Sequence, residues 1–284
     1  MTSTALPTPI VSADTLQAAL AAGSKPLIVD CSFDLADTGA GERAFADGHL
    51  PGAVYAHLDR DLAGAKTGRN GRHPLPTRAD WAATLTRLGA TPGREVVLYD
   101  AQGGMYAARA WWMLRWVGHA AASVLDGGLQ AWKASGGRIE TGAAAPVAAA
   151  TAYVPGSSLV NAIDADALQK SLGRVTVLDA RAGERYRGEV EPLDARAGHI
   201  PGARSRFFKD NLDSQGRFRP AAELRAVFEA FGADPQQVVH QCGSGVTACH
   251  NLLAMEVAGL PGSTLYPGSW SEWSSDPARP VAVG

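Results

Sequence analysis

Gly48-His49-Leu50-Pro51-Gly52-Ala53 occurs a second time in the chain, as Gly198-His199-Ile200-Pro201-Gly202-Ala203. Further matching landmarks lie on either side of each copy and follow the same order in both halves. They are Leu27–Asp30 with Val175–Asp179, Val96–Tyr99 with Val238–Gln241, and Gly127–Trp132 with Pro267–Trp273. A fixed order of landmarks is the signature of a duplicated domain. The histidine of the motif is present in both copies, so we expect it to brace a turn.

The repeat divides the 284 residues into two domains. A chain of this length is long for one compact domain and sufficient for two. We expect an N-terminal domain at residues 23–140, a linker at 141–158 and a C-terminal domain at 159–284. The linker contains the Ala-rich run from Thr141 to Thr151, whose low complexity is typical of a connection.

Short apolar runs alternate with helical segments in both halves. The expected strands are 27–29, 96–99, 123–125, 175–178, 238–241 and 263–266, and the expected helices are 13–22, 78–88, 105–117, 165–172, 221–231 and 246–258. This alternation predicts an α/β fold in which each domain has a mostly parallel sheet flanked by helices. Ligand sites in such sheets lie beyond the carboxyl ends of the strands. The residues after Val96–Tyr99 and Val238–Gln241 are therefore the candidates for a site.

Composition narrows the possible classes of function. The net charge is −2 and the basic residues form no stripe, which argues against nucleic-acid and membrane-surface binding. No apolar run reaches the ~20 residues needed to span a bilayer, and the N-terminus lacks the pattern of a signal peptide. Three cysteines do not suggest a disulfide framework, so we expect a cytoplasmic protein.

The strand of the second half leads directly into Cys242-Gly243-Ser244-Gly245-Val246-Thr247 and then into a helical stretch. Two glycines allow the backbone to curl, and a curled loop at a helix N-terminus directs several N–H groups at one point. These dipoles favour a thiolate, which is nucleophilic without a histidine base. We therefore expect Cys242 to be the nucleophile. A buried structural cysteine, the alternative, would not require the two glycines.

The equivalent position in the first half is Asp100. An aspartate cannot act as a thiolate nucleophile, so we expect the N-terminal domain to be catalytically silent. The other two cysteines lack the same context. Cys249 falls within the helix that follows the loop, and Cys31 follows a strand without a glycine-rich turn. For both we expect a structural role.

The chain resembles the tandem-domain rhodanese-superfamily sulfurtransferases. The resemblance extends from about Lys25 to Trp273 and includes both Gly-His-(Leu/Ile)-Pro-Gly-Ala motifs and the segment Arg109–Arg115. Within the thiosulfate/3-mercaptopyruvate sulfurtransferase family, the loop is most similar to that of the 3-mercaptopyruvate sulfurtransferases. Thiosulfate sulfurtransferases in the narrow sense usually carry Arg and Lys where this chain has Gly243 and Ser244.

The resemblance implies a ping-pong reaction through a persulfide on Cys242. The sulfur donor would be a small molecule, 3-mercaptopyruvate or thiosulfate, and the acceptor would be cyanide, a small thiol or a thioredoxin-like protein. The resemblance implies neither a metal nor an organic cofactor. The uncharged pair Gly243-Ser244 favours mercaptopyruvate, because a compact dianion would need the missing cations. Thiosulfate:cyanide transfer remains the alternative as main activity.

The resemblance also implies roles for residues outside the nucleophile. Arg185 matches the arginine that grips the donor's anionic group, and its planar fork suits a carboxylate. Ser244, His73 and Asp59 match a proposed proton relay, in which histidine carries the proton near neutral pH. The loop residues Gly243, Gly245, Val246 and Thr247 would bind the substrate through their backbone.

One family residue is missing. A second arginine normally follows the Glu-Pro pair, but Leu193 follows Glu191-Pro192 in this chain, and Arg196 lies nearby. The sequence leaves open whether Arg196 takes that role.

Two other functions remain as alternatives. Cysteine phosphatases of the same broad fold need an arginine six residues after the nucleophile, where this chain has Ala248. A non-catalytic rhodanese scaffold module would be expected to lose its loop cysteine, whereas this chain lacks it only in the first half. Both alternatives are therefore disfavoured.

Overall fold

The computed structural model describes residues 5–144, 151–232 and 234–284. The chain divides into two compact units. Unit 1 comprises residues 1–62, 76–159 and 214–217, and unit 2 comprises residues 63–75, 160–213 and 218–284. Residues 63–75, from the first half of the sequence, thus belong to unit 2. No helix in the described part of the chain is long and apolar enough to cross a membrane.

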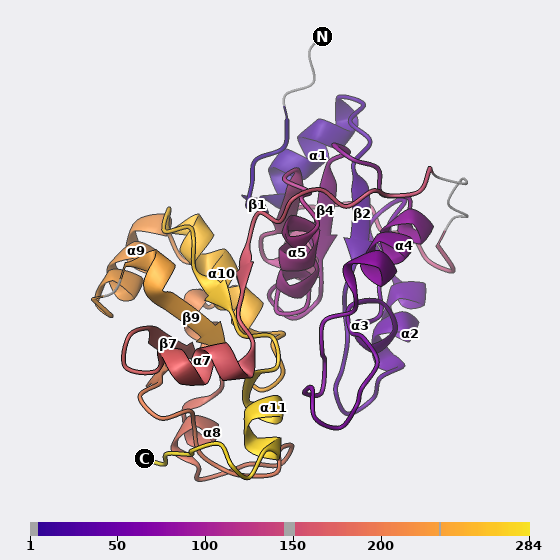
Figure 1. Ribbon diagram of the computed structural model, residues 1–284. Coiled ribbons are helices and arrows are strands. Elements are labelled where there is room, and N and C mark those ends of the chain that lie inside the picture. The colour runs from indigo at the N-terminus through magenta and orange to yellow at the C-terminus, as the bar shows by residue number, and fades with distance from the viewer. Residues whose placement is uncertain (1–4, 145–150, 233) are drawn as a thin grey trace. The chain divides into compact units, whose positions relative to one another are not determined.

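Unit 1 contains a five-stranded sheet in the order β1-β5-β4-β2-β3, with all neighbours parallel (Figure 1). Its strands are β1 (Ile10–Val11), β2 (Leu27–Asp30), β3 (Val54–Tyr55), β4 (Val96–Tyr99) and β5 (Ala122–Leu125). Its helices are α1 (Ala13–Ala21), α2 (Ala40–Asp47), α3 (Leu58–Asp61), α4 (Arg78–Leu88), α5 (Ala107–Trp116) and α6 (Gly128–Ala134).

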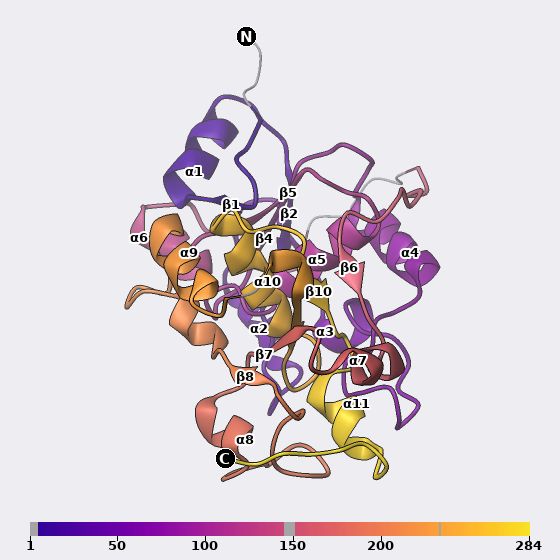
Figure 2. The ribbon, with the colours of Figure 1, turned by 60° about the vertical axis from the view of Figure 1, so that its left-hand side comes forward.

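Unit 2 repeats this arrangement, with a parallel sheet in the order β6-β10-β9-β7-β8 (Figure 2). Its strands are β6 (Asn161–Ala162), β7 (Thr176–Asp179), β8 (Arg204–Ser205), β9 (Val238–Gln241) and β10 (Thr264–Leu265). Its helices are α7 (Ala165–Ser171), α8 (Gly183–Arg187), α9 (Ala221–Glu229), α10 (Ala248–Val257) and α11 (Ser269–Ser275), with 3-10 turns at Phe208–Asn211 and Pro235–Gln237. The predicted α/β fold with two parallel sheets is confirmed.

Helices cover both faces of each sheet because the central strands are apolar on both sides. Strands β4 and β9 are buried at every residue. In unit 2, α10 packs on β9 and β10, while Val239 on the opposite face joins a core with Leu168 of α7 and Trp270 of α11. Unit 1 has α5 on one face and a core around Leu16 and Trp132 on the other.

The two histidines of the repeated motif occupy equivalent environments. His49 stacks on Phe45 at a ring separation of 3.8 Å, and its Nδ1 lies 2.7 Å from the Phe45 carbonyl oxygen. His199 stacks on Tyr186 at a ring separation of 4.0 Å, and its Nδ1 lies 2.8 Å from the Tyr186 carbonyl oxygen. Each histidine also forms an antiparallel bridge with a residue near the end of its half, Glu140 or Ala282. The motif therefore ties the last segment of each unit to its sheet.

Candidate active site

The loop Cys242–Thr247 joins the buried end of β9 to the start of α10. Cys242 is a free thiol with 2 % of its surface exposed. Its backbone N–H donates to Ser269 Oγ (3.1 Å), and its carbonyl accepts from the Trp270 N–H (2.9 Å). The loop is thereby fastened to the first turn of α11. The Gly245 N–H points at the sulfur and lies 3.2 Å from Cys242 Sγ.

The two glycines of the loop are required for different reasons. Gly245 has a φ of +77°, and a Cβ there would lie 2.2 Å from the Pro267 carbonyl oxygen. No other residue fits without moving backbone. At Gly243 a Cβ would lie 2.9 Å from Arg72 Nη2 and 3.4 Å from Arg185 Nη1. The absent side chain at Gly243 therefore leaves space for two guanidinium groups directly after Cys242.

Arg72 and Arg185 share one carboxylate. Asp194 forms an ion pair with Arg72 Nη1 through Oδ1, and with Arg185 Nη2 through Oδ2 at 3.1 Å. Glu191 adds a second ion pair to Arg185 at 2.6 Å. The Arg72 N–H donates to Ser271 Oγ (3.0 Å), which anchors its segment to α11. Arg185 was a predicted site residue, whereas the sequence did not indicate Arg72.

The charge network continues inwards to Arg181, which is buried. Arg181 pairs with Asp179 at 2.6 Å and with Glu191 at 3.3 Å, and its guanidinium lies 4.7 Å from the centre of the Trp270 ring. Burial by itself lowers the pKa of Arg181, but Asp179 and then Glu191 outweigh it, and the pKa is raised. For Asp194, burial raises the pKa of the carboxyl, while Arg72 acts in the opposite direction.

Ser244 and His73 are in hydrogen-bond contact. The Ser244 Oγ lies 2.8 Å from His73 Nδ1, and both side chains are buried. His73 belongs to the 63–75 segment of unit 2, so two members of the predicted relay lie together within one unit.

Asp59 belongs to α3 of unit 1, where its N–H donates to His57 Nδ1 (3.1 Å). Asp61, the other carboxylate of α3, forms an ion pair with Arg87 and accepts a hydrogen bond from the His57 N–H at 2.8 Å. Asp59 as third relay member stays a prediction.

Val246 and Thr247 form the junction between loop and helix. Val246 is buried, and its carbonyl accepts from the Cys249 N–H at 3.1 Å. Thr247 occupies the N-cap position of α10 without a side-chain capping bond. Cys249 is fully buried, and its thiol donates to the Gly245 carbonyl at 3.3 Å. Cys31 is also fully buried, and burial raises the pKa of its thiol well above the usual value.

Arg196 does not face the loop. Its guanidinium donates to the carbonyl oxygens of Trp273, Ser274, Asp276 and Arg279, at distances from 2.6 to 3.2 Å. It therefore satisfies the carbonyl groups left free at the end of α11. Leu193 is 47 % exposed. The second cation beside Gly243 comes from Arg72.

In unit 1, the Asp100 carboxylate fills the loop that corresponds to Cys242–Thr247. It accepts from the N–H groups of Gln102, Gly104, Tyr106 and Ala107, at 2.8 to 3.0 Å. The Asp100 carbonyl accepts from the Leu129 N–H (3.0 Å), as the Cys242 carbonyl does from Trp270. This loop geometry therefore binds an anion, and in unit 1 the anion is part of the chain.

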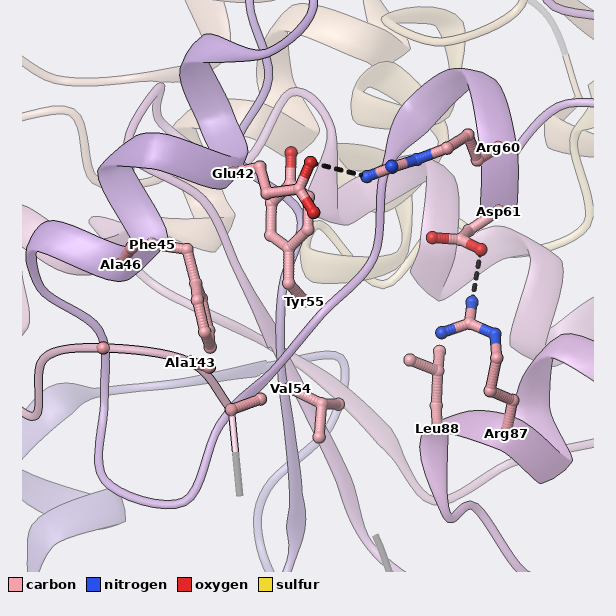
Figure 3. Close-up of a pocket in the computed structure, with 12 residues that line it drawn as sticks. Glu42, Phe45, Ala46, Val54, Tyr55, Arg60, Asp61, Arg87, Leu88 and Ala143 are labelled. Carbon is pink, nitrogen blue, oxygen red and sulfur yellow. Dashed lines mark hydrogen bonds and ion pairs between the residues drawn. The ribbon is translucent and has the colours of Figure 1, made fainter. Parts of the chain in front are cut away.

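A separate pocket lies in unit 1 (Figure 3). Its rim carries the ion pairs Arg60–Glu42, at 2.9 Å, and Arg87–Asp61. Its walls are largely apolar and come from α2, β3, α4 and residues 142–144. None of the residues predicted as a site lines this pocket, and the lining contains no cysteine, serine or histidine.

The two units have parallel sheets with equivalent strand orders. The loop after β9 contains a buried thiol, whereas the loop after β4 contains a carboxylate. The protein is therefore a tandem α/β protein in which one of the two equivalent loops begins with a cysteine. A family model described as "Rhodanese-like domain" matches residues 12–135 and 164–276. The chain belongs to the rhodanese family.

Several relatives extend over nearly the whole chain. A Pseudomonas aeruginosa protein, whose name gives 3-mercaptopyruvate sulfurtransferase as its probable activity, is 48% identical and covers 91% of this chain and 92% of its own length. A Mycobacterium tuberculosis protein with the provisional name thiosulfate sulfurtransferase is 42% identical, covering 97% of both. The solved structure of 3-mercaptopyruvate sulfurtransferase from Leishmania major matches with a TM-score of 0.83 and 31% identity, over 94% of this chain and 74% of that one.

Proposed function

We propose that this chain is a sulfurtransferase that moves sulfur from 3-mercaptopyruvate to a thiol or cyanide acceptor, through a persulfide on Cys242. The observation that carries the proposal is the position of the thiol. It lies at the start of a curled loop, accepts the Gly245 N–H and has two guanidinium groups beside the next residue. The names of the relatives in P. aeruginosa and L. major support the choice of donor.

Donor binding follows from the arginine pair. A carboxylate is a planar, bidentate acceptor that matches the guanidinium fork. One Nη atom of Arg72 and one of Arg185 lie beside the space that a side chain at Gly243 would fill, so a donor carboxylate held there would place its sulfur next to Cys242. Thiosulfate is the second candidate, because the same two arginines supply cations to an anionic donor and the M. tuberculosis relative carries that name.

In the first half-reaction the Cys242 thiolate attacks the sulfur of mercaptopyruvate. A sulfur–sulfur bond forms, the carbon–sulfur bond breaks, and its electron pair leaves on carbon as the enolate of pyruvate. The enolate takes up a proton, which the donor's own thiol or the Ser244–His73 pair can supply. The products are pyruvate and the Cys242 persulfide, whose terminal sulfur is an anion at the N–H groups of the loop.

In the second half-reaction an acceptor removes that terminal sulfur. Cyanide, a small thiol or a thioredoxin-like protein attacks it, the sulfur–sulfur bond breaks, and the electron pair returns to Cys242 as thiolate. Val246 and Thr247 at the start of α10 contribute the helix N-terminus that stabilises negative charge in both states.

We assign the nucleophile to the C-terminal domain at residues 159–284, joined by a linker at 141–158 to an N-terminal domain at 23–140 whose own loop, at Asp100, is catalytically silent. Arg72 and His73, from residues 63–75, complete the site in unit 2. The four N–H bonds to the Asp100 carboxylate support silence, because they leave the loop of the first domain without room for a substrate anion. A cytoplasmic location is part of the proposal, supported by three cysteines that are free thiols.

Intact-mass spectrometry tests the nucleophile. After incubation with 3-mercaptopyruvate and removal of small molecules, the wild-type protein is expected to gain the mass of one sulfur atom. The Cys242→Ser variant should show no gain and should have the wild-type circular dichroism spectrum. Cys249→Ser serves as the matched control and should gain the sulfur. A gain that survives in Cys242→Ser would refute the assignment.

A further inference from the structure

Asp194 binds one Nη atom of each arginine, Arg72 Nη1 and Arg185 Nη2. The other Nη atoms lie beside the position that a Cβ at residue 243 would take, Arg72 Nη2 at 2.9 Å and Arg185 Nη1 at 3.4 Å. One carboxylate thus holds both arginines, and each arginine keeps one nitrogen for the site. A donor anion at Gly243 would meet these two nitrogens and would share both cations with Asp194.

The six charges of the network alternate and cancel. Starting from the interior they follow the order Asp179, Arg181, Glu191, Arg185, Asp194 and Arg72, with ion pairs between neighbours. The side chains of Asp194 and Glu191 are 2 % and 3 % exposed, whereas Arg185 and Arg72 are 18 % and 26 % exposed. The network therefore presents cationic groups to a ligand although its total charge is zero.

A neutral network treats a monoanion and a dianion differently. A monoanionic carboxylate can accept hydrogen bonds from Arg72 Nη2 and Arg185 Nη1 without leaving a large excess of negative charge at the site. A dianion such as thiosulfate adds a second negative charge beside the buried Asp194 and the Cys242 thiolate. In a site shielded from water, such like-charge contacts are costly.

We propose that Asp194 determines donor specificity: by neutralising the Arg72–Arg185 pair it selects a monoanionic carboxylate donor and discriminates against a compact dianion. This inference rests on the proposed sulfur-transfer function of the same site. It also accounts for a site that contains two arginines at the loop and nevertheless suits mercaptopyruvate.

The Asp194→Asn variant tests this inference because it removes one negative charge and keeps the shape of the side chain. With cyanide as acceptor, kcat/KM is measured for 3-mercaptopyruvate and for thiosulfate. The ratio of thiosulfate to mercaptopyruvate is expected to rise at least ~10-fold, which corresponds to about 1.4 kcal/mol. The change should appear mainly as a lower KM for thiosulfate.

Two control variants separate charge at the site from other effects. Glu189→Gln removes the same charge from an exposed residue that pairs with Arg187, and its ratio should equal that of the wild type. Asp194→Glu retains the charge, so its ratio of thiosulfate to mercaptopyruvate should equal that of the wild type even where the longer side chain lowers both rates. An equal loss with both donors in Asp194→Asn would show that Asp194 only positions the arginines, and an unchanged ratio would equally overturn the inference.

A measurement on the wild-type protein holds even if Asp194→Asn does not fold. Pyruvate and sulfate are compared as protectants of Cys242 against iodoacetamide, with the alkylated peptide quantified by mass spectrometry. Pyruvate should protect at a lower concentration than sulfate, and the opposite order would contradict the inference. Absence of turnover with either donor would instead refute the proposed function.

Discussion

Gly243 follows the nucleophile directly, and its missing side chain leaves room for two guanidinium groups. The sequence shows no cation within the loop itself, because Gly243 and Ser244 stand where narrow-sense thiosulfate sulfurtransferases usually carry Arg and Lys. The cations are nevertheless present, supplied by Arg185 and Arg72 from other segments. Each is held by Asp194 so that its charge is balanced before a donor arrives.

Arg185 and Arg196 offer a matched pair for testing the donor site. Arg185→Ala removes a charge-assisted hydrogen-bond donor worth about 1.5–3 kcal/mol, so the KM for mercaptopyruvate should rise about 10- to 100-fold. Arg196→Ala removes an arginine whose guanidinium donates to four carbonyl oxygens at and just beyond the end of α11. It should lower the melting temperature and leave KM unchanged.

Steady-state kinetics and thermal unfolding of both variants distinguish the two roles. A normal KM in Arg185→Ala would remove this residue from the donor site. A raised KM in Arg196→Ala would mean that Arg196 acts at the loop after all, in the position that the sequence leaves open beside Leu193.

Local signals explain which site residues could be predicted. Cys242, Gly243 and Gly245 are consecutive or nearly so, and their pattern alone indicates a curled loop at a helix start. No local pattern indicates Arg72, because it is far from Asp194 and Cys242 in the sequence and the fold alone brings it to Asp194. The sequence drew attention to its neighbour His73, which does contact Ser244.

At the scale of the elements, the proposed nucleophile Cys242 lies in the loop between strand β9 and helix α10. The predicted central strands are all present, because each has two or three consecutive buried apolar residues, or four in β4, which is a strong signal. The edge strands β1, β3, β6 and β8 were not predicted, since two residues show no periodicity. The predicted helix at 105–117 is observed as Ala107–Trp116, because the loop around Asp100 uses the first residues.

His240 lies on β9 two residues before the nucleophile and faces α10, with Nε2 3.0 Å from Met255 Sδ. Complete burial, followed by the charge of Arg206, lowers the pKa of His240 to about 3. Between about pH 6.5 and 3 the unfolded chain therefore binds one proton more than the folded chain at this residue. Acidification should cost about 1.4 kcal/mol per pH unit, or about 2 kcal/mol at pH 5.

Urea unfolding of the wild type and of His240→Leu at pH 7 and pH 5 measures this contribution. The free energy of unfolding should fall more steeply with acidification in the wild type, because the leucine does not titrate. The comparison uses the slopes, so any constant packing cost of the leucine cancels. Equal pH dependence of the free energy of unfolding in both proteins would show that His240 binds no additional proton on unfolding.

At the scale of the whole molecule, the two repeats place a loop at the same position of each sheet, after β4 and after β9, with a different acceptor group in each. In unit 2 the loop holds the Cys242 sulfur, and in unit 1 it holds the Asp100 carboxylate through four N–H groups. The repeat itself was visible in the sequence from the paired motifs. That Asp100 fills its loop could not be read there, because an aspartate at a strand end is also a common turn residue.

Asp100→Ala separates stability from catalysis in this arrangement. The substitution leaves four N–H groups without their acceptor, so the free energy of unfolding should fall by about 2 to 4 kcal/mol. The kcat and KM for mercaptopyruvate should stay within about two-fold of the wild type below the melting temperature, since the chemistry belongs to Cys242. Asp100→Asn retains one acceptor oxygen and should lose less stability. A large drop in kcat in folded protein would show that the Asp100 loop takes part in the reaction.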